Sequence, residues 1–137
     1  MNAEWREAVE RNDVHTIRIL LDSGATIDQK DKYGQTALWI ATEKGYIDLV
    51  RLLIDRGADL NVTAKYHLTP LMLSITLYRY QIARLLIEAG ADFSIRGGKG
   101  AMGFKGKTAL MLAQERVEAL KGQIEIVDLL KKAGAKE

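Results

Sequence analysis

The chain has 137 residues, of which 47% are hydrophobic and 28% charged, and this balance predicts a single soluble globular domain. The formal net charge of +2 is too small to indicate nucleic acid as a partner, and the basic excess lies in the second half: residues 1–63 carry 8 Lys/Arg against 11 Asp/Glu, and residues 64–137 carry 12 against 7. There is no cysteine, which excludes disulfides and thiolate chemistry.

The first residues lack the apolar core of a signal peptide, and no apolar run approaches the roughly 18 residues that span a bilayer. We therefore expect no membrane partner, and cytoplasmic localisation is the default expectation. Two histidines, His15 and His67, are too few and too isolated for a metal site, which needs three or four ligands. No cofactor is expected.

A repeated spacing organises the chain. Gly24, Gly57 and Gly90 each precede an alanine and lie 33 residues apart, and Gly134 follows Gly90 after 44. Each glycine ends an apolar helical pattern. Thr36, Thr69 and Thr108 recur in the same register at the start of an earlier helical pattern, where a hydroxyl is suited to cap a helix. Each unit is therefore predicted to be a helix, a turn, a second helix and an extended connection.

In chain order the units are residues 1–30 as an N-terminal cap, 31–63, 64–96 and 97–137. Ala3 stands at the threonine position of the first unit, and Pro70 follows the threonine of the third. A single unit cannot bury its own apolar stripe, so stacking of neighbours must form the core. The prediction is one all-α domain, a solenoid of stacked helix-turn-helix units with projecting hairpin or loop fingers, and a monomer.

The pattern resembles the ankyrin repeat family over essentially the whole chain, with residues 31–63 as the best match. Some positions depart from the family. The signature histidine is replaced by Trp39, Met72 and Met111, so its usual hydrogen bond must be absent or replaced. His67 and Tyr78 stand where turn glycines are expected, which predicts distorted turns in the third unit.

The 11 additional residues before Gly134 divide into two insertions. Five of them fall near residues 114–121, a segment rich in helix formers, and are predicted to extend the first helix of the last unit by about a turn and a half. Six fall in residues 96–107, which hold four positive charges, five glycines and no acid. This segment is predicted to be a long, mobile finger. It is either a tolerated surface loop or a binding loop for an acidic surface.

Residues 101–108, from Ala101 to Thr108, match a relaxed phosphate-loop pattern, with alanine in place of the first glycine. The same Gly-Lys-Thr is already explained as the repeat's own turn and cap, in register with Gly34-Gln-Thr36. No strongly β-rich segment precedes it. Nucleotide binding is therefore the weak alternative, and we expect no enzyme activity.

An aromatic-basic pattern is the stronger functional signal. Lys32-Tyr33 and Lys65-Tyr66 lie 33 residues apart and are expected side by side on adjacent tips, with Phe104-Lys105 at the comparable place in the last unit. The tyrosines either bind a partner or only pack the tips together. The ankyrin resemblance implies a protein partner on the tips and the concave face of the first helices, and the basic second half favours an acidic one. A self-associating structural solenoid is a further alternative. The expected contact residues are Lys32, Tyr33, Gln35, Glu43, Lys44, Lys65, Tyr66, Leu68, Thr76, Leu77, Arg96, Lys99, Phe104, Lys105, Lys107, Glu115 and Arg116.

Overall fold

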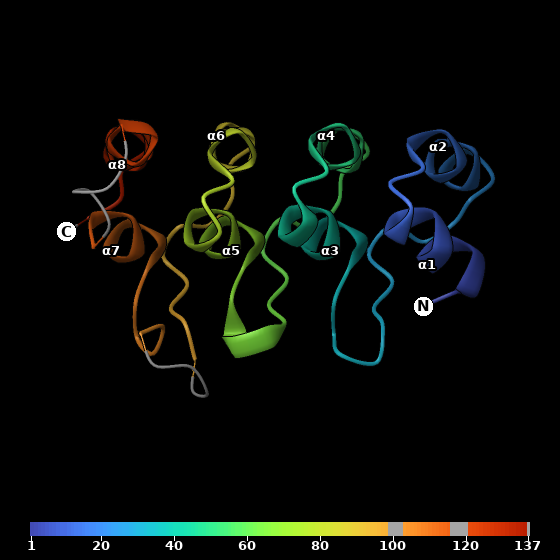
Figure 1. The fold of residues 1–137 in the computed structure, drawn as a ribbon, viewed down its shortest axis with the longest axis horizontal. Coiled ribbons are helices and arrows are strands. Elements are labelled where there is room, and N and C mark those ends of the chain that lie inside the picture. Colours follow the sequence, from blue (N-terminus) through green and yellow to red (C-terminus); the bar gives the residue numbers. More distant parts are fainter. Residues whose placement is uncertain (99–102, 116–120, 137) are drawn as a thin grey trace.

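A computed structural model describes residues 1–98, 103–115 and 121–136. Within these residues the chain forms four helix pairs that stand side by side in one row, with loops projecting from one edge (Figure 1). The predicted all-α stack is confirmed, and the described residues contain an isolated bridge between Gly97 and Lys105 but no strand. The helices are α1 (Ala3–Glu10), α2 (Val14–Asp22), α3 (Ala37–Lys44), α4 (Ile47–Asp55), α5 (Pro70–Thr76), α6 (Tyr80–Glu88), α7 (Ala109–Gln114) and α8 (Lys121–Lys132).

The first helices of the pairs form one layer and the second helices form the other (Figure 1). α3 packs against α1, α4 and α5, and α4 packs against α2, α3 and α6. Every residue of α3 from Ala37 to Thr42 is buried, whereas α4 buries only a stripe. The core therefore runs continuously along the row, and each pair completes the hydrophobic surface of the next. No helix among the described residues combines the length and the apolar character needed to cross a membrane.

The predicted threonine caps are confirmed. The Oγ1 atoms of Thr36, Thr69 and Thr108 accept hydrogen bonds from backbone N–H groups three residues later, at 3.3, 3.2 and 3.3 Å. Pro70 occupies the first position of α5, where a missing N–H costs little. In the first unit the helix cap is Asn2, whose side chain accepts hydrogen bonds from the backbone N–H groups of Glu4 and Trp5.

Trp39 supplies the replacement for the missing signature histidine. Its indole Nε1 donates to the carbonyl of Leu68 over 2.9 Å, and its side chain is buried, at 1% exposure. This bond joins the first helix of the second unit to the base of the next projecting loop. The expected replacement of a hydrogen bond thus exists at Trp39, where the side chain offers a donor.

The turn at Tyr78 is not distorted, and that prediction is wrong. Tyr78 has a φ of 61°, close to the 77° of Gly45. The same two hydrogen bonds close both turns. Gly45 and Tyr78 each donate to a carbonyl three residues earlier, at 3.2 Å, and the residues that follow them, Tyr46 and Arg79, donate to a carbonyl five residues earlier, at 2.9 and 2.7 Å. The backbone therefore keeps its conformation, and Tyr78 carries the cost of the left-handed region, about 1–2 kcal/mol.

The tip of the third unit does differ, as predicted. At the tip of the second unit Gly34 alone is left-handed, with φ 77°, whereas at the tip of the third unit Tyr66 and His67 both are, with φ of 57° and 55°. A short 3₁₀ turn, Lys65–His67, results. Both tips retain the equivalent bond, from Gly34 N–H to the Asp31 carbonyl and from His67 N–H to the Ala64 carbonyl, each 3.0 Å.

The predicted extension of the last unit's first helix is wrong at Glu115, where α7 has already ended after six residues; the rest of that segment, residues 116–120, lies outside the described residues. α8 has 12 residues, against nine in each of α2, α4 and α6. Part of the inserted length therefore belongs to the second helix. The buried Gln123 side chain donates to the Ala113 carbonyl at the end of α7, over 3.0 Å.

Polar bonds between neighbouring units repeat with the same spacing as the helices. The Tyr46 hydroxyl donates to the Glu10 carbonyl at 3.2 Å, and the Arg79 guanidinium donates to the Glu43 carbonyl at 3.1 Å. Each donor lies 36 residues after its acceptor. Both bonds satisfy a carbonyl at the end of a first helix, a position that the helix itself leaves without a partner. The units are thereby held in register by directional bonds as well as by apolar packing.

Candidate functional site

The projecting tips carry the predicted aromatic and basic side chains. The Lys32 ammonium lies 5.1 Å from the centre of the Tyr33 ring, and the Lys65 ammonium lies 5.3 Å from the centre of the Tyr66 ring. The two ammonium-to-ring distances are nearly equal although the backbones of the two tips differ. Each is a cation–π contact of modest strength at an exposed site, about 0.5–1 kcal/mol.

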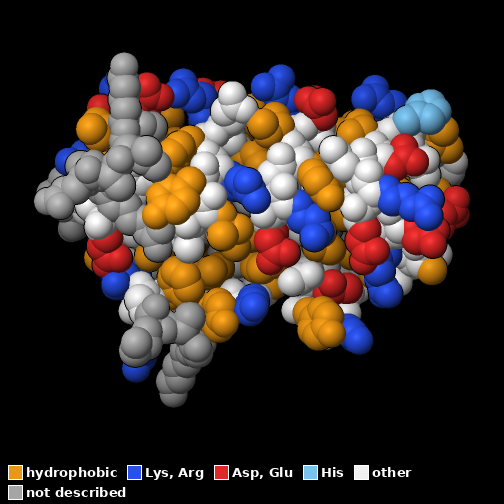
Figure 2. Space-filling view, in the orientation of Figure 1, with side chains coloured by type: hydrophobic (Ala, Val, Ile, Leu, Met, Phe, Trp, Pro, Cys, Tyr) orange, Lys and Arg blue, Asp and Glu red, His pale blue; other side chains and the backbone are white. Residues whose placement is uncertain are grey.

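The two tyrosines have different environments. Tyr33 is the most exposed large hydrophobic side chain described, at 67%. Tyr66 is half-buried, and its ring centre lies 5.8 Å from that of Phe104. Packing between tips therefore buries part of the Tyr66 side chain, whereas most of the Tyr33 side chain remains exposed to solvent. Figure 2 shows hydrophobic side chains and Lys or Arg side chains together along the edge from which the loops project.

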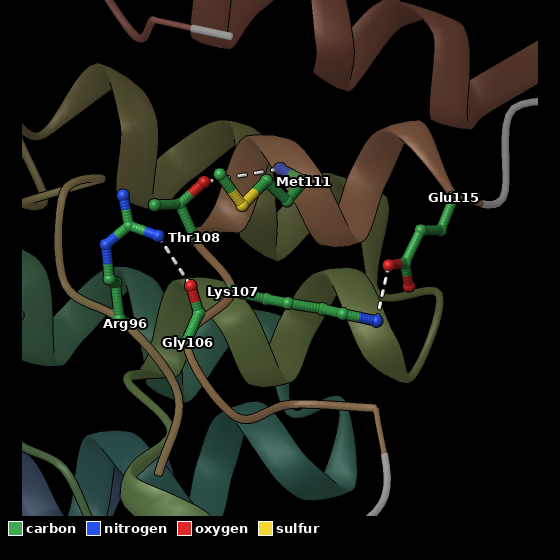
Figure 3. Close-up of polar contacts among 6 residues, drawn as sticks. All are labelled: Arg96, Gly106, Lys107, Thr108, Met111 and Glu115. Carbon is green, nitrogen blue, oxygen red and sulfur yellow. Dashed lines mark hydrogen bonds and ion pairs between the residues drawn. The ribbon is translucent and has the colours of Figure 1, made fainter.

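The base of the finger is closed by hydrogen bonds. Gly97 N–H donates to the Lys107 carbonyl and Gly106 N–H donates to the Gly97 carbonyl, both at 2.9 Å. The Arg96 guanidinium donates to the Gly106 carbonyl at 2.6 Å (Figure 3). Arg96 thus has a structural bond within the finger. The predicted mobility of the finger, and the Lys99 contact, concern residues 99–102, which lie outside the described residues.

Two glycines allow the finger to lie against its neighbour. Gly98 N–H donates to the Tyr66 carbonyl at 2.9 Å, and a Cβ at Gly98 would come within 2.7 Å of the His67 Cβ. A Cβ at Gly97 would collide with the Phe104 carbonyl. The finger base and the preceding tip are therefore one packed unit, which places Phe104 on Tyr66.

Lys107 and Glu115 were both expected to contact a partner, and they pair with each other (Figure 3). The ion pair joins the base of the finger to the end of α7. The Thr108 side chain accepts a hydrogen bond from the Met111 N–H and so caps α7. The Gly-Lys-Thr sequence therefore serves the turn and the helix cap of the repeat. A phosphate loop requires a strand directly before it, and no described strand leads into this Gly-Lys-Thr sequence.

The remaining expected contact residues follow the inner layer of first helices. Lys44 is exposed and Leu77 is 38% exposed, while Gln35, Glu43 and Thr76 are half-buried. Arg116 lies outside the described residues.

Leu68 is not available to a partner, and the expectation of an exposed Leu68 is wrong. Its side chain is only 2% exposed and belongs to the hydrophobic core. The loop turns inward at this residue because its carbonyl accepts the Trp39 indole N–H.

Three exposed apolar side chains were not anticipated. They are Ile19 (49%), Ile124 (45%) and Tyr78 (46%). Ile19 and Ile124 belong to α2 and α8, the outer helices at the two ends of the row (Figure 1). The signal available in the sequence was that terminal units lack one neighbour, so part of their apolar stripe has no covering helix. Tyr78 makes an edge-on contact with Tyr80, with ring centres 6.1 Å apart.

No group of three potential metal ligands lies together among the described residues. The resolved pKa shifts are structural: a hydrogen bond from the Thr16 side chain lowers the pKa of Asp13, and one from the Ser94 side chain lowers the pKa of Asp92. Both carboxylates serve turns or caps, so neither is arranged for acid–base chemistry at neutral pH.

The family described as "Ankyrin repeats (3 copies)" matches residues 6–97, about two thirds of the chain. The chain belongs to the ankyrin repeat family. The match begins within α1 and runs through the third helix pair. The fourth pair of this ankyrin stack is recognised from its Thr108 cap and its packing on α5 and α6. Ankyrin repeats are in general protein–protein interaction modules. No curated protein matches the chain.

Proposed function

We propose that this ankyrin chain is a non-catalytic module that binds a partner protein through its projecting tips and the exposed ends of its first helices. The observation that carries the proposal is the Lys–Tyr pair repeated on adjacent tips, with Tyr33 67% exposed. A large aromatic side chain that the fold leaves in solvent is suited to anchor a partner, because it buries a large area at a small cost in conformational entropy.

The supporting surface is well ordered by its own bonds. The Asp31 carboxylate accepts the N–H groups of Tyr33 and Gln35, each at 2.9 Å, and so holds the first tip. The second tip is held by the finger base and by Phe104. Because the tips are held before a partner arrives, binding requires less ordering of the chain.

The first helices of the pairs extend this surface. Leu77 and Lys44 are exposed at the ends of α5 and α3, on the same layer from which the tips project. The Lys107–Glu115 pair lies farther along, and a partner there would have to compete with an existing ion pair. We therefore place the centre of the interface on the tips of the second and third units, with the finger base at its edge. An acidic partner surface is favoured by the lysines on these tips.

The test is capture of partners followed by affinity measurement. The protein is immobilised, bound proteins are identified by mass spectrometry, and each purified candidate is measured by calorimetry against the unmodified chain and two variants. In the first variant Tyr33, Tyr66 and Lys105 are replaced by alanine. In the control variant Ile19, Ile124 and Lys132 are replaced, which removes comparable exposed side chains from the second-helix layer.

We expect the tip variant to lose at least about tenfold in affinity, since anchors of this kind contribute about 1–2 kcal/mol each. The control variant should bind as the unmodified protein does, and both should retain the helical circular dichroism spectrum. If the tip variant binds normally, or the control variant alone loses affinity, the proposed face is wrong.

Light scattering on the same samples tests the alternative of a self-associating solenoid. We expect the mass of one chain, 15.3 kDa. A mass that increases with concentration, and returns to one chain when Ile19 and Ile124 are replaced by serine, would support association through the ends of the row. Absence of ATP binding to the unmodified protein would exclude the phosphate-loop alternative.

A further inference from the structure

We infer that the tips bind an acidic segment in the polyproline II conformation, with a glutamate or aspartate at every third position. This inference rests on the proposed function and names the chemistry of the partner. It follows from three features of the tips: their unpaired lysines, their spacing and the covering of their aromatic rings.

Lys32, Lys65 and Lys105 are exposed, one on each projecting segment. Among the described residues none of the three forms an ion pair. The other two described cations of the last segment are already used, since Lys107 pairs with Glu115 and Arg96 donates to the Gly106 carbonyl. The tips therefore present one available ammonium group per unit, which matches a carboxylate-bearing partner.

The spacing of the units selects the partner's conformation. Packed helices lie about 8–10 Å apart, so tips carried by successive helix pairs recur at about that interval. A polyproline II helix has 3 residues per turn and rises about 3.1 Å per residue, so every third side chain lies on one face at intervals of about 9.3 Å. In a β-strand, residues three apart point to opposite faces. Of these two extended forms, polyproline II is the one that offers one carboxylate to each lysine in succession.

The aromatic rings favour such a segment over a single-stranded nucleic acid. Nucleic acid binding of this kind depends on bases that stack on open ring faces. The Lys32 and Lys65 ammonium groups each lie over a face of the neighbouring tyrosine ring, and Tyr66 also packs against Phe104. Tyr33 is 67% exposed, so prolines between the acidic residues can pack against it, as they do in aromatic-lined peptide grooves.

The experiment uses the complete chain and synthetic peptides, with fluorescence anisotropy as the readout. The phased peptide contains Glu-Pro-Pro triplets, and the block peptide has the same composition with all glutamates adjacent. Both are measured at low and at physiological salt against the unmodified protein, the Lys32→Ala/Lys65→Ala variant and the Lys132→Ala control. A single-stranded oligothymidine of similar length is measured in parallel.

We expect the phased peptide to bind about three- to tenfold more tightly than the block peptide, since only the phased peptide engages all three lysines. The double variant should abolish that preference, and Lys132→Ala should leave it unchanged. Equal affinity for both peptides, or tighter binding of oligothymidine, would overturn the inference. If neither peptide binds while captured proteins still depend on the tip residues, this inference fails and the proposed function stands.

Discussion

Replacing each of the two buried tryptophans by phenylalanine tests the hydrogen bond that connects a helix to a projecting tip. Trp5 and Trp39 are each 1% exposed and stand at neighbouring positions of the 33-residue register, since Trp5 aligns with Leu38. The Trp39 indole N–H donates to the Leu68 carbonyl at 2.9 Å. The buried Trp5 indole N–H has no acceptor among the described residues. Both substitutions replace an indole by a phenyl ring, but only Trp39→Phe removes a hydrogen bond.

The magnitude follows from that difference. Trp39→Phe loses a hydrogen bond worth about 1 kcal/mol, and the Leu68 carbonyl keeps only the weaker 3.3 Å bond from Ala64 N–H. Trp5→Phe removes a buried donor that lacks a partner, which relieves about 1–3 kcal/mol. Since loss of ring volume is common to both, Trp39→Phe should be the more destabilising by about 2–4 kcal/mol.

Urea unfolding followed by circular dichroism provides the measurement, with the slope m compared between variants to confirm that the same surface is exposed. Hydrogen exchange should show faster exchange of the Lys65–His67 tip in Trp39→Phe than in Trp5→Phe. If Trp5→Phe proves equally or more destabilising at unchanged m, then the indole bond is not what distinguishes the two sites, and the reasoning is refuted.

Three further predictions concern turns and caps. Gly45→Ala should destabilise the fold by about 1–2 kcal/mol in urea unfolding, because φ is 77° and the new Cβ would lie 3.1 Å from the Arg79 guanidinium. His67→Gly should stabilise it by about 1 kcal/mol, since φ is 55° at an exposed position; a lower urea midpoint would contradict this. Because the Thr16 hydrogen bond lowers the pKa of Asp13, the stability it contributes is present above the unfolded pKa near 3.9 and is lost as pH falls through the folded value. Asp13→Asn should therefore flatten the loss of stability below about pH 4, and an unchanged pH profile would exclude Asp13 as a cause.

Local rules were sufficient wherever the backbone conformation depends on a few neighbouring residues. The threonine caps were predictable because a hydroxyl before an apolar helical pattern satisfies N–H groups three residues away. The side-by-side Lys–Tyr tips followed from spacing alone, since equal spacing in a stack puts equivalent residues on adjacent units. The same local reasoning failed at Glu115, where α7 has already ended, because helix propensity does not decide which of two neighbouring helices receives an insertion.

The sequence by itself determined the family, the number of helix pairs, the helix starts and the segments that project, because a 33-residue period leaves one way to bury every apolar stripe. Only the tertiary structure decided which projecting residues meet solvent. Leu68 is buried because a tryptophan 29 residues earlier draws its carbonyl inward, and Tyr66 is half-covered because two glycines let the finger lie against it. Tyr78 keeps a glycine-like turn because the packed helices on either side determine its backbone. For Leu68 and Tyr66 the deciding contact joins residues that are distant in sequence, and no local pattern records such a contact.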